Sequence, residues 1–288
     1  MKRVLITGTG DIGFVGRNLA EAFDGIYNLY TPTYKELDLT DTEAVSCYFD
    51  RHEIDIVIHS CSSMQNTLDS DLRMFFNLEK HIGKDNKMIY FGSGAEFDKR
   101  YDIIEASEDD IGKQIPNDGY GYAKYIMNAY ARQSKNIFNL RFFGIFGKYE
   151  DWTYKFISNI CCKAVFNLPL SIRRDCRLDY IYIDDLPKVI MWFIENDPDY
   201  NDYNFALGTP VLLSELADMV LEISGKKLDI EILNPEGHNN EYSASNERLR
   251  KQLPWFEPTP LYKAIEKLYK WYYDNSDTID LERLRQTR

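Results

Sequence analysis

Residues 2–16 of this chain read KRVLITGTGDIGFVG, and they indicate its fold class. Lys2 to Thr7 predicts a short buried strand, and Asn18 to Phe23 predicts a helix. Glycines between a first strand and a first helix let the backbone approach a pyrophosphate at the helix N-terminus. This order predicts a dinucleotide-binding loop with the candidate contacts Gly8, Gly10, Asp11, Ile12, Gly13, Phe14 and Val15.

Short apolar strands alternate with helical patterns along most of the chain. The predicted strands lie at about 27–31, 54–59, 87–91, 136–143 and 203–208. Such alternation is typical of proteins whose parallel sheet is covered by helices on both faces. We therefore predict an α/β fold with a Rossmann-type, doubly wound parallel sheet.

A second stretch, GYGYAK at residues 119–124, predicts chemistry. Tyr120 and Lys124 stand four residues apart in a predicted helix, so their side chains share one face. A phenol normally titrates near pH 10, and a nearby ammonium lowers that pKa towards a useful acid/base range. The spacing also arises by chance in a chain with 21 tyrosines, so an ordinary helix with a surface lysine is the alternative. Ser93, at the end of a predicted strand 27 residues earlier, supports the catalytic interpretation.

Three motifs together resemble a known family. Gly10-x-x-Gly13-x-x-Gly16, the set Ser93, Tyr120 and Lys124, and residues 139–147 (NLRFFGIFG) resemble motifs of the extended short-chain dehydrogenases. These are nucleotide-sugar epimerases, dehydratases and reductases. The glycine loop departs from the family pattern, because Gly8 already stands where the first glycine is expected. Either the loop is about two residues longer, or Gly8 and Gly10 share that role.

The resemblance implies how the chain is divided and which residues do what. It implies a Rossmann domain over 1–147 plus about 178–196, and a smaller, discontinuous substrate-binding domain over 148–177 and 197–288. It also implies that Ser93, Tyr120 and Lys124 are catalytic. The further cofactor contacts that it implies are Asp38, Leu39, Ser60, Cys61, Ser62, Lys124, Phe142 and Phe143.

For the substrate, the resemblance implies a nucleotide diphosphate sugar, with Ser93, Gly94 and Tyr120 at the sugar. In the family an arginine directly before the motif's aspartate grips the diphosphate. Leu178 fills that slot before Asp179 here, so we expect the grip to come from Arg177, helped by Arg173 or Arg174. Arginine geometry suits a diphosphate, although a solvated basic turn is the alternative. Gly144 stands where the family has a substrate-binding asparagine.

The segment after the second predicted strand bears on cofactor choice. NAD-preferring sites usually carry an acid at the end of this strand to bind the ribose 2′-hydroxyl. None stands between Asn28 and Lys35, and Arg17 and Lys35 are close in sequence. This favours NADP(H) over NAD(H).

Several reactions remain open. The absent acid, the modest length and a segment at 32–41 similar to GDP-fucose synthase-like enzymes favour the reduction of a 4-keto-6-deoxy sugar. A 4-epimerase with tightly bound NAD is the alternative. A 4,6-dehydratase fits least, because Gly94-Ala95 stand where that group has Asp-Glu. A non-catalytic NAD(P)-binding regulatory protein is disfavoured by the complete Ser93, Tyr120 and Lys124 set.

Composition excludes some functions. A net charge of −12 argues against nucleic-acid binding, which needs a basic surface. No apolar run approaches the 18 or so residues that would span a membrane. Five cysteines at irregular spacing show no metal signature and predict reduced thiols in the cytoplasm. We also expect a homodimer.

Overall fold

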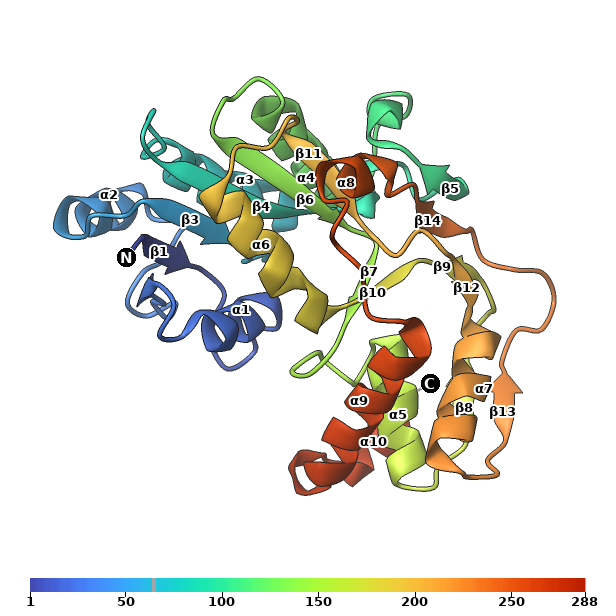
Figure 1. Cartoon of the computed structure of the whole chain (residues 1–288). Coiled ribbons are helices and arrows are strands. Elements are labelled where there is room, and N and C mark those ends of the chain that lie inside the picture. The colour runs from blue at the N-terminus through green and yellow to red at the C-terminus, as the bar shows by residue number, and fades with distance from the viewer. Residues whose placement is uncertain (64–65, 288) are drawn as a thin grey trace.

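A six-stranded, fully parallel sheet forms the centre of the molecule in the computed structural model, which describes residues 1–63 and 66–287 (Figure 1). Every neighbouring pair of its strands is parallel. From one edge to the other the strands are β2 (Asn28–Tyr30), β1 (Arg3–Ile6), β3 (Ile56–His59), β4 (Lys87–Ser93), β6 (Ile137–Phe142) and β11 (Asp202–Phe205). The predicted α/β class with a parallel sheet is confirmed.

Helices cover both faces of this sheet. One face carries α1 (Val15–Phe23) and α6 (Leu186–Glu195), and the other carries α2 (Thr42–Arg51), α3 (Thr67–Glu79) and α4 (Gly119–Ala131) (Figure 1). Successive side chains of a strand point to opposite faces. Accordingly Ile6 of β1 packs in one apolar core with Leu19, whereas Leu5 packs in the other with Phe75. The sheet is therefore doubly wound.

A second group of elements lies beyond the carboxyl ends of the central strands. Its helices are α5 (Phe156–Val165), α7 (Leu213–Ser224), α9 (Leu261–Asp274) and α10 (Leu281–Gln286). The short helix α8 (Glu247–Gln252) lies instead beside β11, where Arg248 pairs with Asp202 and Gln252 accepts from the Tyr203 hydroxyl. One small sheet joins β12 (Val211–Leu212), β9 (Arg177–Leu178), β14 (Tyr242–Ala244) and β5 (Ile103–Ala106). This group also contains two separate two-stranded sheets. One pairs β7 (Gly144–Phe146) with β10 (Tyr180–Tyr182), and the other pairs β8 (Leu170–Ile172) with β13 (Ile230–Ile232).

Two strands pair across the domain boundaries that the family resemblance implies. β11 pairs with β6 in the central sheet, although residues 197–288 were grouped with the substrate-binding half. β5, within residues 1–147, pairs with β14 in the small sheet. The reason is that strand pairing brings together segments far apart in sequence, and no local pattern in either strand specifies its partner.

A buried ionic network lies under the end of β4. The side chain of Arg141 is fully buried, and its guanidinium lies 2.7 Å from Glu96 Oε2 and 3.0 Å from Asp202 Oδ2. Burial alone would raise the pKa of Asp202, but Arg141 and Arg132 outweigh burial and the net pKa is lowered. Glu96 also accepts the backbone N–H of Ser93 at 3.1 Å. The network therefore fixes the backbone from which Ser93 projects.

The sheet order also locates a ligand site. The chain passes from β1 to β2 on one side and then crosses to β3 on the other side of β1, so the direction of winding reverses between β1 and β3. In doubly wound sheets the crevice outside the carboxyl ends at such a reversal is where ligands bind. The residues that follow these two strands are the glycine loop from Gly8 and the loop Ser60–Ser62. No helix among residues 1–63 and 66–287 is long and apolar enough to cross a membrane.

Candidate active site

The glycine loop is too tightly folded for side chains at three positions. A Cβ at Gly13 would lie 2.1 Å from the Gly8 carbonyl oxygen, and one at Gly16 would lie 2.5 Å from the same atom. Gly8 has φ +73°, which favours glycine, whereas Gly10 has open space around it. Gly8, rather than Gly10, therefore takes the first-glycine role. This close backbone cradle before α1 fits a dinucleotide pyrophosphate.

The remaining predicted loop residues differ in their surroundings. Val15 lines the central cavity described below. The preceding residue, Phe14, is half-buried. Asp11 is exposed, and Ile12 is 94% exposed at the outer tip of the loop. Only the inner part of the loop thus faces the crevice.

The loop after β3 is tied to the end of β1. The Ser60 N–H donates to Thr7 Oγ1 at 3.1 Å, and the Ser60 hydroxyl donates to the Thr7 carbonyl. Ser62 donates to the buried Asp71 at 2.7 Å. Ser60, Cys61 and Ser62 all line the central cavity. The Ser60 bonds tie this loop to the end of β1, and the Ser62 bond ties it to α3.

Asp38 and Leu39 lie in the loop before α2. The Asp38 carboxylate accepts from the Thr40 N–H at 2.9 Å and from the Tyr34 hydroxyl at 3.0 Å. The Leu39 side chain is buried in the core under α2 and α3. Any contact of Leu39 with an adenine must therefore use its backbone.

One cavity of about 500 Å³ brings the predicted catalytic residues together. Ser93 reaches it from the end of β4, and Tyr120 and Lys124 reach it from α4. Helix α4 begins where Asp118 accepts the Gly121 N–H at 2.9 Å, which fixes its first turn. Phe142 and Phe143 also line the cavity, as predicted for the side that would hold the nicotinamide.

The electrostatics of Tyr120 differ from the sequence-based expectation. Burial raises the pKa of Tyr120, while a hydrogen bond with Ser93 acts in the opposite direction. The Lys124 ammonium lies 5.7 Å from the centre of the Tyr120 ring. Burial lowers the pKa of Lys124 itself. The predicted lowering of the tyrosine pKa by Lys124 is therefore wrong for the protein alone, because sequence spacing does not report desolvation. At neutral pH Tyr120 is a protonated phenol, the form that can give a proton.

Several lining residues were not predicted from the sequence, and three of them carry polar groups of interest. Tyr242 places its hydroxyl 3.4 Å from Ser93 Oγ. Glu150 is buried, and burial raises its pKa to about 7 although Ser158 donates to it. Lys155 precedes α5 and lies at the same cavity. Glu150 and Lys155 directly follow the NLRFFGIFG motif, which is the signal that could have suggested them. Tyr242 has no such signal.

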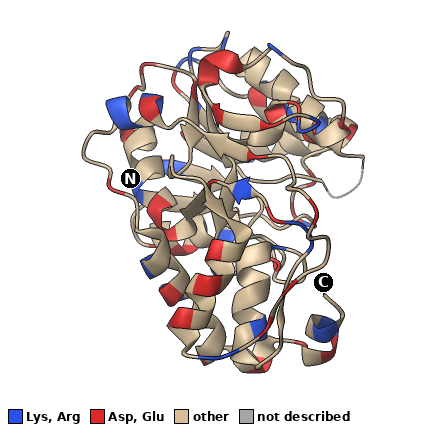
Figure 2. Ribbon diagram, turned by 90° about the vertical axis from the view of Figure 1, so that its right-hand side faces the viewer, with Lys and Arg blue, Asp and Glu red and all other residues tan. Residues whose placement is uncertain are grey.

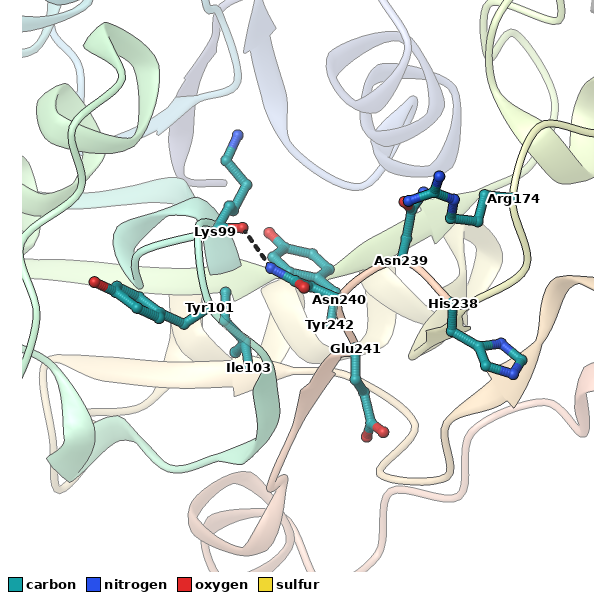
Figure 3. Close-up of a pocket in the computed structure, with 9 residues that line it drawn as sticks. All are labelled: Lys99, Tyr101, Ile103, Arg174, His238, Asn239, Asn240, Glu241 and Tyr242. Atoms are coloured by element: carbon teal, nitrogen blue, oxygen red, sulfur yellow. Dashed lines mark hydrogen bonds between the residues drawn. The ribbon is translucent and has the colours of Figure 1, made fainter. Parts of the chain in front are cut away.

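The three arginines do not converge on the catalytic cavity. Leu178 lines that cavity, and its strand neighbour Arg177 is exposed, with Nη1 3.4 Å from the Pro210 carbonyl oxygen. Arg173 is exposed as well. Arg174 lines an adjoining cavity of about 370 Å³ together with Lys99 and His238 (Figure 3).

Tyr242 lies on the wall of both cavities. Figure 3 shows it behind Asn240, which donates to the Lys99 carbonyl oxygen at 3.1 Å. Gly94 packs against this tyrosine and does not itself line the central cavity within the described residues.

Packing explains the absence of the family's asparagine. A Cβ at Gly144 would lie 2.7 Å from the Tyr180 ring and 2.8 Å from the Asp179 carbonyl oxygen. The close pairing of β7 with β10 thus leaves no room for a side chain at this position.

An exposed lysine lies in the turn that follows β2. Lys35 is exposed and forms no ion pair with any of the residues that the structure describes. Glu36 is engaged with Thr33, accepting its N–H at 2.7 Å. Arg17, the other cation expected near a 2′-phosphate, lies over the Tyr149 ring, 3.6 Å from the ring centre, and 3.7 Å from Glu21.

Comparison with known proteins gives a family match and close structural likenesses. A family model described as "NAD dependent epimerase/dehydratase family" matches residues 4–206. GDP-L-colitose synthase of Yersinia pseudotuberculosis is 26% identical, over 78% of this chain and 83% of that protein.

Two solved structures show the same fold. A GDP-L-fucose synthetase from Naegleria fowleri bound to NADP superposes with a TM-score of 0.81 at 16% identity, covering 96% of this chain and 95% of that one. The UDP-glucose 4-epimerase of Thermotoga maritima gives 0.79 at 17% identity, covering 95% and 99%. At such low identities these likenesses establish the fold alone.

Proposed function

Since the chain belongs to the NAD dependent epimerase/dehydratase family, we propose that it is an NADPH-dependent reductase of a nucleotide diphosphate 4-keto-6-deoxy sugar. The observation that carries the proposal is the meeting of Ser93, Tyr120 and Lys124 in one cavity, next to the glycine cradle and the loop after β3. The names of the Yersinia relative and the Naegleria structure, both GDP-sugar synthases, support a GDP-linked substrate.

The proposed chemistry divides among these side chains. When bound, the nicotinamide supplies hydride to C4 of the sugar. Tyr120 gives its phenolic proton to the C4 oxygen, on which negative charge develops, and Ser93 donates a hydrogen bond to the same oxygen. Lys124, buried one turn along α4, stabilises the phenolate that Tyr120 leaves behind. Phe142 and Phe143 exclude water from the reacting atoms.

A 4-epimerase is the second candidate, supported by the likeness to the Thermotoga enzyme and by the same three catalytic side chains. The two functions differ in how the cofactor is held. We expect the purified protein to bind NADPH exchangeably, and to oxidise one NADPH for each sugar reduced. A stoichiometric NAD that survives gel filtration, with sugar interconversion and no added cofactor, would assign the chain to the epimerases.

We propose that the half built around the central sheet binds the cofactor and that the C-terminal elements bind the substrate. We further propose that the protein acts as a homodimer in the cytoplasm. All five cysteines are free, which supports a reducing compartment. Light scattering on the purified protein tests the dimer.

NADPH is expected to bind about ten- to a hundredfold more tightly than NADH, as one or two charge-assisted bonds to the 2′-phosphate would give. The support is the exposed ammonium of Lys35 in the turn after β2, with no acid between Asn28 and Lys35. Lys35→Ala should remove most of this preference, and Lys84→Ala, an exposed lysine elsewhere, should not. Fluorescence titration with both cofactors measures the ratio of the NADPH and NADH dissociation constants in each protein. Equal affinities in the unmodified protein would contradict the NADPH assignment.

Arg174→Ala is expected to raise KM about ten- to a hundredfold, with kcat changed far less, because diphosphate contacts are alike in ground and transition states. We propose that Arg173, Arg174 and Arg177 together hold the diphosphate, and Arg174 contributes most because it lines a cavity that shares Tyr242 with the catalytic one. Figure 2 shows acidic and basic residues interspersed over both halves of the molecule, and a net charge of −12 makes a local cation cluster necessary for a dianion.

Steady-state kinetics of alanine variants at the three arginines test this assignment. Arg250→Ala, an exposed arginine on α8, is the matched control. A larger KM rise in Arg177→Ala than in Arg174→Ala would assign the diphosphate to Arg177. Unchanged KM in all three variants would show that the diphosphate binds outside this cluster.

A further inference from the structure

Tyr242 reaches Ser93 from a strand of the small sheet, on the opposite side of the central cavity. It stands 149 positions from Ser93 in sequence, and its hydroxyl lies 3.4 Å from Ser93 Oγ. It belongs to β14, which pairs with β5 and with β9 at Leu178. The residue thus comes from the small sheet, whereas Ser93 comes from the central one.

The phenol ring of Tyr242 is held closely in place. A Cβ at Gly94 would come within 2.6 Å of its hydroxyl oxygen, so the glycine after Ser93 makes room for it. The Phe143 ring lies 5.0 Å away, centre to centre, on the side of the nicotinamide wall. A ring fixed by both neighbours can hold its hydroxyl at one place beside Ser93.

The hydrogen bonds of Ser93 suggest what this hydroxyl does. A serine hydroxyl has one proton to donate and two lone pairs to accept with. One lone pair of Ser93 Oγ accepts the Ala95 N–H at 3.1 Å. Burial raises the pKa of Tyr242, so it remains a protonated phenol and can donate to the second lone pair. With both lone pairs occupied, the Ser93 proton is directed towards Tyr120, where the reacting oxygen would lie.

We propose that Tyr242 is a positioning residue for the reduction: by donating to Ser93 it turns the serine proton towards the C4 oxygen of the substrate. The inference rests on the proposed function, because it assigns Tyr242 a part in that reaction. It differs from a structural role, since the effect of Tyr242 must pass through Ser93.

A double-mutant cycle tests this dependence. Tyr242→Phe keeps the ring and removes only the hydroxyl. We expect it to lower kcat about tenfold, the effect of one lost hydrogen bond, with KM and the NADPH dissociation constant within about twofold of the unmodified protein. Ser93→Ala should lower kcat about a hundredfold. Tyr242→Phe should then cost nothing further in the Ser93→Ala background. Tyr122→Phe, an exposed hydroxyl deletion on α4, should leave kcat unchanged.

Two results would overturn the proposal. One is an equal loss of kcat from Tyr242→Phe with and without the Ser93 hydroxyl. The other is a rise in KM at unchanged kcat, which would make Tyr242 a simple substrate contact. Gly94→Ala provides a second variant, because its methyl group must push the phenol away from Ser93. It should reproduce the kcat loss of Tyr242→Phe, and a normal kcat would count against the proposal.

Unfolding of the cofactor-free proteins separates this inference from the proposed function. If the unmodified protein reduces no keto sugar, the proposed function fails. The contact between Tyr242 and Ser93 is then judged by Tm alone. The contact is supported if the Tm losses of Tyr242→Phe and Ser93→Ala add up to more than the Tm loss of the double variant. It is overturned if the two losses are additive.

Discussion

Tyr120→Phe is expected to lower kcat about 10²- to 10⁴-fold, which is the usual contribution of a general acid. The phenol supplies a proton but does little to hold the dinucleotide, so NADPH should bind with nearly unchanged affinity. The half-buried ring packs in the cavity with Ser93 and Lys124, and phenylalanine preserves that packing. Stopped-flow kinetics and a fluorescence titration of NADPH measure the two quantities separately.

The matched control is Tyr122→Phe on the same helix, whose ring is exposed and stacks on Tyr125. It should retain normal turnover. A Tyr120→Phe enzyme that keeps half or more of the original kcat on its true substrate would remove Tyr120 from the mechanism.

Arg141→Met is expected to lower the free energy of unfolding by about 3–5 kcal/mol, because it leaves the buried Glu96 carboxylate without its cationic partner. Asp202 keeps its ion pairs with Arg132 and Arg248. Arg141 contacts Glu96, Asp202 and the Asn204 side chain, the last at 2.8 Å. Methionine fills much of the volume but returns neither charge nor hydrogen bonds. Urea unfolding followed by circular dichroism gives the value.

Two further variants separate charge from geometry. Arg141→Lys retains the charge but loses the planar fork, so its loss of stability should fall between that of Arg141→Met and zero. Arg250→Met, at an exposed site, should change stability by less than about 0.5 kcal/mol. A loss below about 1 kcal/mol for Arg141→Met would show that the network is not needed for the fold.

The parts of this molecule that could be predicted from sequence are those specified by local patterns. The glycine loop was predictable because Gly13 and Gly16 are required by close packing against the Gly8 carbonyl, which lies only a few residues away in sequence. Tyr120 and Lys124 share a cavity because helix periodicity puts positions i and i+4 on one face. Ser93 meets them because α4 packs against the end of β4 and the turn of helix that follows it.

The arginine cluster shows where local reasoning stops. Adjacent strand residues point to opposite sides, so a one-residue shift before Asp179 puts Leu178 into the cavity and turns Arg177 away from it. The sequence shows that three arginines lie close together, but it does not show which side of β9 each side chain occupies. The sequence favoured Arg177 as the main diphosphate contact, whereas only Arg174 lines the adjoining cavity.

Tyr242 and the pKa of Tyr120 depend on tertiary structure alone. Tyr242 meets Ser93 only because β14 joins β5 and β9 in the small sheet. The pKa of Tyr120 rises because of burial, a quantity that residue spacing does not contain. The same applies to β11, whose place beside β6 is set by strand pairing.

The most direct test of the proposed reaction is transfer of deuterium from 4-deuterated NADPH to a GDP-linked 4-keto-6-deoxy sugar, followed at 340 nm and by mass spectrometry of the product. The proposed function predicts one NADPH oxidised per sugar and one deuterium retained at C4. Interconversion of sugars with no NADPH consumed and no deuterium in the product would contradict it.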